Sequence, residues 1–212
     1  MKARRPSLES AYALETPEDS VALYRDWASS YDTGFAAERG YVYAREVARI
    51  FCREAGPHDT PVLDIGAGTG LVAEHLDGTV DGIDISAEML EVAGSKGLYR
   101  NRIVADLTGP LPLGAASYGG LVSAGTFTHG HVGPGCLPEL LRIARPGALF
   151  CIGINEEVFD SAGFGSAFAA HVATGAITPL GFERVRIYER AADGLVDAHT
   201  DDTCLVATFR RR

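Results

Sequence analysis

The chain has 212 residues, of which 46% are hydrophobic and 22% are charged. This length is typical of one domain that buries its own apolar core, and the apolar content excludes an intrinsically disordered chain. The 28 acidic residues outnumber the 19 basic ones and give a net charge of −9, which argues against a nucleic-acid partner. No apolar stretch approaches the ~20 residues of a membrane span, and the first residues lack the apolar run of a signal peptide. We therefore expect a cytoplasmic protein without a membrane partner.

Helix signals open the ordered part of the chain. Thr16 is a predicted N-cap, because Pro17 follows at the first helical position and acidic residues come next, at the positive end of the helix dipole. This helix is expected to run to about Ser30. A second helix is predicted over residues 35–55. We expect these two N-terminal helices, residues 16–55, to act as a lid.

The pattern then changes to alternating strands and helices. Strands are predicted over residues 61–65, 79–83, 101–105, 118–124, 148–154, 182–189 and 203–209. Helices are predicted over residues 71–76, 87–94, 138–145 and 161–174. This alternation predicts an α/β fold with a doubly wound, mostly parallel seven-stranded sheet and an antiparallel C-terminal strand. Residues 1–15 are expected to be a flexible leader, and residues 16–212 a single domain.

A glycine-rich turn follows the first predicted strand. The segment Asp64-Ile65-Gly66-Ala67-Gly68-Thr69-Gly70 has glycines at alternate positions, which allow a tight turn and a close approach of the backbone to a ligand. A second acid, Asp84, ends the next predicted strand, where a carboxylate can accept hydrogen bonds from two ribose hydroxyls. The alternative is an ordinary strand-helix turn with a solvated Asp84. Because both acids lie at strand ends, we favour a ligand site.

Two ligands are compatible with such a turn. A dinucleotide fold prefers GxGxxG, but here residue 71 is Leu71 and the last glycine comes one residue early. Asp64 beside the turn suits an ammonium group and would repel a pyrophosphate. The chain also lacks the Tyr-x-x-x-Lys pair of a short-chain dehydrogenase. These features favour S-adenosylmethionine over NAD.

The ordered series of motifs resembles a known family. VLDIGAGTG, VDGIDIS, ADL and PELLRIARPGALF look like the motifs of class I S-adenosylmethionine-dependent methyltransferases, which have a Rossmann-like fold, over about residues 24–209. DWASSYD, GLYR and SAGTFTHGHVGPGCLPEL are similar to the Williams–Beuren-region methyltransferase-like proteins. The chain departs from the family pattern at Tyr118-Gly119, in place of an aromatic-Asp pair, and at Gly147-Ala148, in place of two glycines. The resemblance implies that residues 16–212 form a single methyltransferase domain.

The resemblance also implies a set of cofactor-binding residues. The set comprises Tyr31, Asp64, Gly66, Ala67, Gly68, Gly70, Asp84, Ile85, Met89, Asp106, Leu107, Ser123 and Ala124. In the family pattern, Asp84 would hold the ribose, Ile85 and Met89 would contact the adenine, and Asp106 would accept a hydrogen bond from the adenine amino group. Asp64 would orient the ammonium group.

Three aromatic residues of the first predicted helix, Tyr24, Trp27 and Tyr31, resemble side chains that close over the methionyl end of the cofactor. The alternative is that they pack the helix on the sheet, and for Trp27 this alternative is as strong.

The expected reaction is transfer of the sulfonium methyl group by in-line displacement, in which the protein mainly orients the reactants. His129 and His131, after the fourth predicted strand, are the candidate general bases for a hydroxyl acceptor; the alternative is that both are solvated loop residues. A zinc site of His129, His131 and Cys136 lacks a fourth ligand, so no metal is expected.

The motifs also limit the acceptor. No Asn/Asp-Pro-Pro-aromatic clamp and no Pro-Cys nucleophile follow the fourth predicted strand, which with the acidic charge favours a small-molecule acceptor over DNA or RNA. A non-catalytic S-adenosylmethionine-binding partner or sensor subunit, and a nicotinamide-dependent oxidoreductase, remain as alternatives. The oligomeric state is not predicted.

Overall fold

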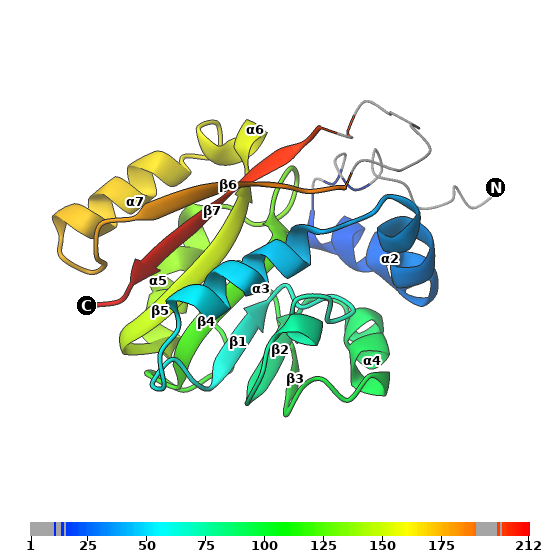
Figure 1. Ribbon diagram of the computed structural model, residues 1–212, viewed down its shortest axis with the longest axis horizontal. Coiled ribbons are helices and arrows are strands. Elements are labelled where there is room, and N and C mark those ends of the chain that lie inside the picture. The colour runs from blue at the N-terminus through cyan, green and yellow to red at the C-terminus, as the bar shows by residue number, and fades with distance from the viewer. Residues whose placement is uncertain (1–10, 12–13, 15, 190–198, 200) are drawn as a thin grey trace.

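The computed structural model describes residues 11, 14, 16–189, 199 and 201–212. Its centre is one seven-stranded sheet with the strand order β3-β2-β1-β4-β5-β7-β6 (Figure 1). The strands are β1 (Val62–Ile65), β2 (Val80–Asp84), β3 (Arg102–Val104), β4 (Tyr118–Phe127), β5 (Ala144–Asn155), β6 (Gly181–Arg186) and β7 (Thr203–Arg210). Strands β1 to β5 run parallel, whereas β7 lies between β5 and β6 and is antiparallel to both. The predicted α/β fold with a mostly parallel sheet and an antiparallel C-terminal strand is confirmed.

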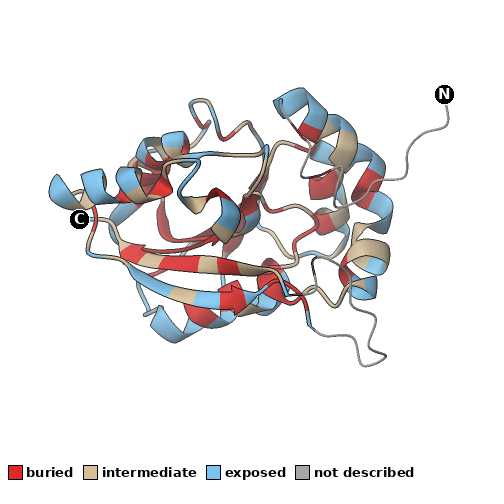
Figure 2. Ribbon diagram, turned by 90° about the horizontal axis from the view of Figure 1, so that it is seen from above, coloured by how far each residue is buried: buried red, intermediate tan, exposed pale blue. Residues whose placement is uncertain are grey.

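Helices cover both faces of the sheet. They are α2 (Pro17–Trp27), α3 (Tyr43–Glu54), α4 (Ala87–Ser95), α5 (Leu137–Ile143), α6 (Glu156–Phe159) and α7 (Phe164–Ala173). Short 3₁₀ turns span Ala28–Ser30, Ala73–His75 and Pro134–Cys136, and a π-helical turn spans Tyr31–Ala36. Because parallel strands are covered on both faces, their side chains are apolar on both sides, and the buried residues gather along the sheet (Figure 2).

Alternate residues of the strands supply two cores. Leu63, Leu121 and Phe150 point to one face, where they pack with α5 and α7. Val62 and Val122 point to the other face, where α3 covers them. Because side chains alternate between the two faces, both cores lie on the faces of the sheet. The loops that follow the parallel strands meet at the carboxyl ends of the strands, and the site lies at that edge.

Three expectations about element boundaries are wrong. The second helix begins at Tyr43 and not at residue 35, because Gly40 has a left-handed φ of 60° and breaks the helix after the π-helical turn. The helix predicted over 71–76 is only the 3₁₀ turn Ala73–His75. Helix α5 ends at Ile143, and Pro146 lies inside the long strand β5.

Most of the expected leader, residues 1–15, lies outside the described residues; Ala11 and Leu14, which are described, are buried. Among the described residues, no helix is long and apolar enough to cross a membrane. The same residues contain no cluster of three or more side chains suited to hold a metal ion.

Candidate active site

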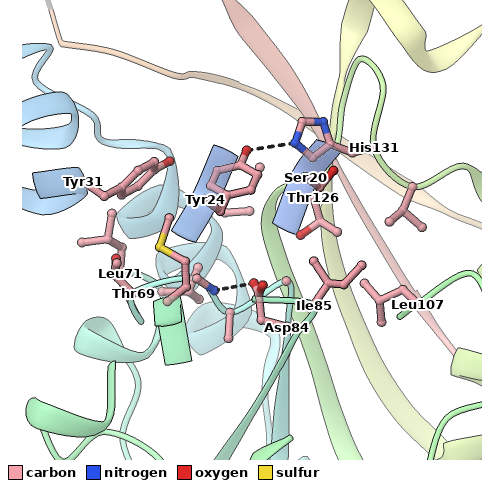
Figure 3. Close-up of a pocket in the computed structure, with 18 of the residues that line it drawn as sticks. Ser20, Tyr24, Tyr31, Thr69, Leu71, Asp84, Ile85, Leu107, Thr126 and His131 are labelled. Atoms are coloured by element: carbon pink, nitrogen blue, oxygen red, sulfur yellow. Dashed lines mark hydrogen bonds between the residues drawn. The ribbon is translucent and has the colours of Figure 1, made fainter. Parts of the chain in front are cut away.

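A cavity of about 450 Å³ opens at the carboxyl ends of β1, β2 and β4, beneath helix α2 (Figure 3). Its lining includes many of the residues that the sequence singles out, namely Tyr31, Gly66, Ala67, Gly68, Asp84, Ile85, Met89, Asp106, Leu107, Ala124 and His131. Four predicted residues, Asp64, Gly70, Ser123 and His129, are not part of the lining. The cavity therefore gathers most, but not all, of the predicted site.

The glycine turn forms the floor of the cavity. Gly66 and Gly68 have left-handed φ angles of 64° and 52°, which favour glycine. A Cβ atom on Gly66 would collide with the side chain of Thr126, whereas Gly68 faces open space. The turn thus needs glycine at residue 66 for packing, and at residue 68 it presents bare backbone to the cavity.

Asp84 is bound to the glycine turn. Its Oδ2 atom accepts a hydrogen bond from the Gly68 N–H at 2.8 Å (Figure 3). Its Oδ1 atom accepts one from the Ser86 N–H at 2.8 Å. Burial raises the pKa of the Asp84 carboxyl, and these backbone donors oppose that rise. A carboxylate has about four acceptor positions, so each oxygen retains capacity for a further donor from the cavity.

Asp64 lies beneath the turn. The side chain is 1% exposed, and Tyr99 donates a hydrogen bond to its Oδ2 atom at 2.7 Å. The Oδ1 atom has no hydrogen-bond partner among the described residues. Burial raises the pKa of Asp64 from 3.8 to about 8, against the lowering effect of the Tyr99 hydroxyl. The sequence predicts that Asp64 orients an ammonium group; in the structure it supports the turn from below and does not line the cavity.

Two further predicted residues have a supporting position. Gly70 has a φ of 91° and packs against Leu98, where a Cβ atom would be too close. The hydroxyls of Ser123 and Thr126 lie 2.8 Å and 2.9 Å from the carbonyl oxygen of Ile65, so they connect the end of β4 to the end of β1. These contacts hold the cavity floor together.

Asp106 lies on the other side of the cavity, after β3. Its Oδ1 atom accepts hydrogen bonds from the Thr108 N–H at 2.8 Å and the Thr108 hydroxyl at 2.7 Å. Leu107 is buried beside it, and Ile85 and Met89 also line the cavity. Two acids thus border an apolar slot, which suits a flat ring with polar edges.

Helix α2 forms the roof of the cavity. Its residues Pro17, Ser20 and Tyr24 line the cavity, and the N-cap Thr16 does as well. Thr16, Pro17 and Ser20 are site residues that the motifs did not predict, although their spacing places them with Tyr24 on one face of a helix. That periodicity is the signal that could have found them. The side chain of Thr69 in the glycine turn was also missed.

A hydrogen bond and an ion pair connect the segment after α2 to the glycine turn and to α4. The Thr69 hydroxyl donates a hydrogen bond to Asp32 Oδ1 at 2.5 Å, and the Lys96 ammonium lies 2.5 Å from Asp32 Oδ2. Lys96 also forms an ion pair with Glu74. This network, which we call the lid latch, joins the π-helical turn, the glycine turn and the end of α4.

The two candidate histidines have different surroundings. His131 lines the cavity, and its Nε2 atom lies 2.9 Å from the Tyr24 hydroxyl (Figure 3). Its Nδ1 atom lies 2.6 Å from the His129 carbonyl oxygen. Burial lowers the pKa of His131. His129 does not line the cavity, and its Nε2 atom lies 3.2 Å from Glu157.

Comparisons with known proteins agree with this geometry. Residues 63–152, which build β1 to β5 and most of the cavity, match the methyltransferase domain family model. A SAM-dependent methyltransferase from Thermotoga maritima aligns with a TM-score of 0.65 and 15% identity, over 91% of this chain and 99% of that chain. The methyltransferase bound to the Haloferax volcanii Trm112 methyltransferase activator aligns with a TM-score of 0.63 and 19% identity, over 89% and 98%.

The match of residues 63–152 to the methyltransferase domain model and the shared fold agree with the class I S-adenosylmethionine-dependent methyltransferases that the motifs predict. The chain is also similar to human methyltransferase-like protein 27, with 29% identity over 157 residues. That match covers 70% of this chain and 62% of the human protein.

Proposed function

We propose that the chain binds S-adenosylmethionine in the 450 Å³ cavity and transfers its methyl group to a small-molecule acceptor by in-line displacement. The observation that carries the proposal is the pairing of Gly68 with Asp84. A bare backbone turn and a carboxylate with spare acceptor capacity lie side by side at the carboxyl ends of adjacent parallel strands. A ligand that has both a ribose and a cationic amino-acid end fits that combination.

The residues present fit this cofactor. Gly68 leaves room that a Cβ atom would fill, Asp84 can accept from ribose hydroxyls, and Ile85 with Met89 forms an apolar wall for an adenine. Asp106 has its Oδ2 atom outside the bonds to Thr108 and can accept from an exocyclic amine. S-adenosylmethionine supplies a methyl group that is already activated on a sulfonium. The protein then has to orient the reactants, which supplies roughly 7–11 kcal/mol of barrier lowering.

The lining favours a small, neutral acceptor. The described lining residues of the cavity include no lysine or arginine, so it offers no cation for a phosphate backbone. The net charge of −9 disfavours DNA and RNA in the same way. Helix α2 covers the cavity, which leaves space for a compact molecule.

For a hydroxyl acceptor we propose His131 as the base of the site. Its Nδ1–H donates to the His129 carbonyl, which fixes the tautomer and leaves the Nε2 lone pair directed toward Tyr24. His129 contributes through its carbonyl oxygen, since its ring is paired with Glu157.

Isothermal titration calorimetry with S-adenosylmethionine, S-adenosylhomocysteine and NAD tests the proposal. We expect both adenosyl compounds to bind with 1:1 stoichiometry and NAD to give no heat of binding. Saturable NAD binding without S-adenosylhomocysteine binding would contradict the proposed methyltransferase function and favour a nicotinamide-dependent oxidoreductase. Cofactor binding without turnover over a broad acceptor panel would favour the non-catalytic subunit.

A further inference from the structure

A groove of about 710 Å³ lies beside the amino ends of β1, β4 and β5, at the edge of the sheet opposite the active site. Its lining comes from the loop between α3 and β1 (residues 56–60), from Gly119 in β4, from residues 145–148 of β5 and from Arg210 in β7. We call it the amino-edge groove. Its volume lies in the range of roughly 300–1,000 Å³ that small-molecule sites occupy, and the proposed cofactor does not account for it.

Positive charge without a carboxylate partner gathers at this edge. Most of the described arginines form an ion pair with an acid. The arginines that have no carboxylate partner within the described residues are Arg102, Arg145, Arg211 and Arg212. The last three lie at the start of β5 or directly after β7. In a chain with a net charge of −9, this edge therefore carries a local excess of positive charge.

Asp59, the single acid among the described lining residues of the groove, is already neutralised. The Arg210 guanidinium donates to both of its oxygens, at 2.7 Å and 3.1 Å, and the Gly56 N–H donates to Oδ2 at 2.7 Å. Burial favours the neutral acid, but these hydrogen bonds outweigh that effect and lower the pKa of Asp59. Asp59 and Arg210 therefore cancel each other's charge, and Arg145 is the uncompensated cation of the groove.

Arg145 and His58 supply the donors that a ligand can use. Arg145 is exposed, and its one side-chain hydrogen bond to a described residue runs from Nη1 to the Thr60 carbonyl oxygen at 2.9 Å. The rest of its guanidinium fork is available. His58 is also exposed, and its ring has no partner among the residues that the structure describes. A planar fork held at one corner, with a second donor from a neighbouring segment, suits the oxygens of a phosphate.

Close packing fixes the backbone segments that carry these donors. A Cβ atom on Gly119 would collide with the His58 carbonyl oxygen and with the Thr60 nitrogen, so the loop rests directly on the backbone of β4. On the other side of the groove, the Gly147 N–H donates to the Arg211 carbonyl oxygen at 2.8 Å. A ligand therefore meets segments that are already in position, and its binding costs little ordering of the backbone.

We propose that the amino-edge groove binds a small molecule through a phosphate group, with Arg145 as the main anchor and His58 as a second donor. Pro57, Pro146 and Ala148 form an apolar wall for the rest of the molecule. The inference does not depend on the proposed methyltransferase function, because the groove and the active-site cavity share no lining residue.

Phosphate fits this set of donors better than a carboxylate does. One guanidinium fork satisfies a carboxylate, whereas a phosphate monoester presents three terminal oxygens and a charge of about −1.5 to −2 near neutral pH. Arg211, which donates from Nη1 to the Ala144 carbonyl oxygen, adds positive charge at the start of β5. The active-site cavity has no lysine or arginine in its described lining, so a phosphorylated molecule is directed to the groove and not to the cofactor site.

An NMR titration with inorganic pyrophosphate locates the site. We expect the backbone amide signals of Gly119 and Gly147 to shift saturably, while the signal of Gly68 in the active-site cavity stays unchanged. Citrate, whose negative charge is carried by carboxylates, should bind at least tenfold more weakly. Absence of a saturable shift, a shift at Gly68 in place of the groove signals, or a citrate affinity equal to that of pyrophosphate would overturn the proposal.

Variants test the donors, with the pyrophosphate dissociation constant as the readout. Arg145→Gln should weaken pyrophosphate binding at least tenfold, and His58→Ala severalfold. Arg102→Gln is the matched control, because Arg102 is also exposed, lacks a carboxylate partner within the described chain and donates from Nη1 to one carbonyl oxygen, that of Leu90. It lies outside the groove and should leave the affinity unchanged. Equal losses in Arg145→Gln and Arg102→Gln would mean that only the overall charge matters, and would contradict the site.

S-adenosylhomocysteine binding separates this inference from the proposed function. Arg145→Gln should bind S-adenosylhomocysteine as the wild type does, and its circular dichroism spectrum verifies the fold. Pyrophosphate bound in the groove of a wild type that does not bind S-adenosylhomocysteine would contradict only the proposed function. Competition between pyrophosphate and S-adenosylhomocysteine would place both in one site and contradict the groove.

Discussion

Two carboxylates near the ends of neighbouring strands, the half-buried Asp84 and the buried Asp64, have different surroundings. Asp84 reaches the cavity and is held by the Gly68 and Ser86 backbone, whereas Asp64 is enclosed below the turn with Tyr99 as its donor. Asp84 is the last residue of β2, whereas Asp64 is the last but one residue of β1 and pairs with Gly82, so Asp84 lies closer to the edge of the sheet. At the scale of single residues, we therefore propose Asp84 as a ligand-binding group and Asp64 as a support of the glycine turn.

The substitution Asp84→Ala tests this assignment for binding. Loss of hydrogen bonds to a charged acceptor should weaken S-adenosylhomocysteine binding by about 1.5–3 kcal/mol, or roughly 10–150-fold. Calorimetry measures the dissociation constant, and the circular dichroism spectrum verifies that the variant folds. Glu91→Gln, at an exposed residue of the following helix, is the control. An unchanged affinity of folded Asp84→Ala for S-adenosylhomocysteine would show that Asp84 does not bind this ligand.

The pKa of Asp64 predicts a pH dependence of stability. Because burial raises this pKa from 3.8 to about 8, the folded state holds the proton more tightly than the unfolded state. The stabilisation is complete below about pH 4 and is lost as the pH rises to 8. Asp64→Asn keeps an acceptor for Tyr99 and has no charge to bury, so it should gain stability relative to the wild type between about pH 5 and about pH 8. Urea unfolding at several pH values measures this, and an equal difference at every pH would contradict the assignment.

At the scale of elements, contacts at the start of α2 and in the turn that follows it hold this helix in position. Thr16 and Asp19 form a reciprocal capping box at its start, with the Asp19 N–H donating to the Thr16 hydroxyl oxygen at 3.2 Å and the Thr16 N–H donating to Asp19 Oδ2 at 3.1 Å. Beyond its other end, in the π-helical turn Tyr31–Ala36, Asp32 of the lid latch accepts a hydrogen bond from Thr69 and pairs with Lys96. The roof of the cavity is thus fastened to its floor by three side chains that are close only in the folded chain.

Breaking the lid latch should loosen the roof. Asp32→Asn removes the charge that holds Lys96, and we expect amide hydrogen exchange in α2 and the π-helical turn to accelerate by about tenfold, as for a loss of ~1.4 kcal/mol. S-adenosylhomocysteine affinity should fall severalfold, because closing the roof then costs more of the binding energy. Asp26→Asn, in an exposed pair with Arg25, is the matched control. Unchanged exchange in Asp32→Asn would show that the aromatic contacts alone hold the roof.

At the scale of the whole molecule, the cavity joins parts that are distant in sequence. Helix α2, the glycine turn, Asp106 and the loop with His131 all contribute to one lining. The sheet order β3-β2-β1-β4 brings these segments to one edge, since it reverses direction at β1. A ligand in this cavity therefore stabilises the fold as a unit.

Ligand stabilisation of the whole protein follows from that arrangement. S-adenosylhomocysteine at 100 times its dissociation constant should raise the free energy of unfolding by about 2.7 kcal/mol, which for a chain of this size is roughly 5–10 °C in melting temperature. Differential scanning calorimetry measures the shift, with NAD at the same concentration as the control. No shift with S-adenosylhomocysteine, or an equal shift with NAD, would argue against the proposed cofactor.

The succession of strands and helices along the chain, and the glycine turn at the floor of the site, could be predicted from the sequence. Apolar runs, caps and the glycine spacing are local signals, so β1, β2, α4 and the turn at Gly66 and Gly68 could be predicted. Boundaries were less certain where local propensity is weak: the helix predicted from residue 35 begins at Tyr43, after Gly40.

The sequence could not show which of the predicted side chains reach the cavity, because this depends on how distant segments pack. His129 and His131 look equivalent in sequence, yet their loop directs one ring to Glu157 and the other to Tyr24, more than a hundred residues away. Likewise, the pairing of Asp32 with Lys96 depends on contacts between distant segments. Such contacts leave no local periodicity, because folding brings their partners together only when the sheet and its covering helices pack.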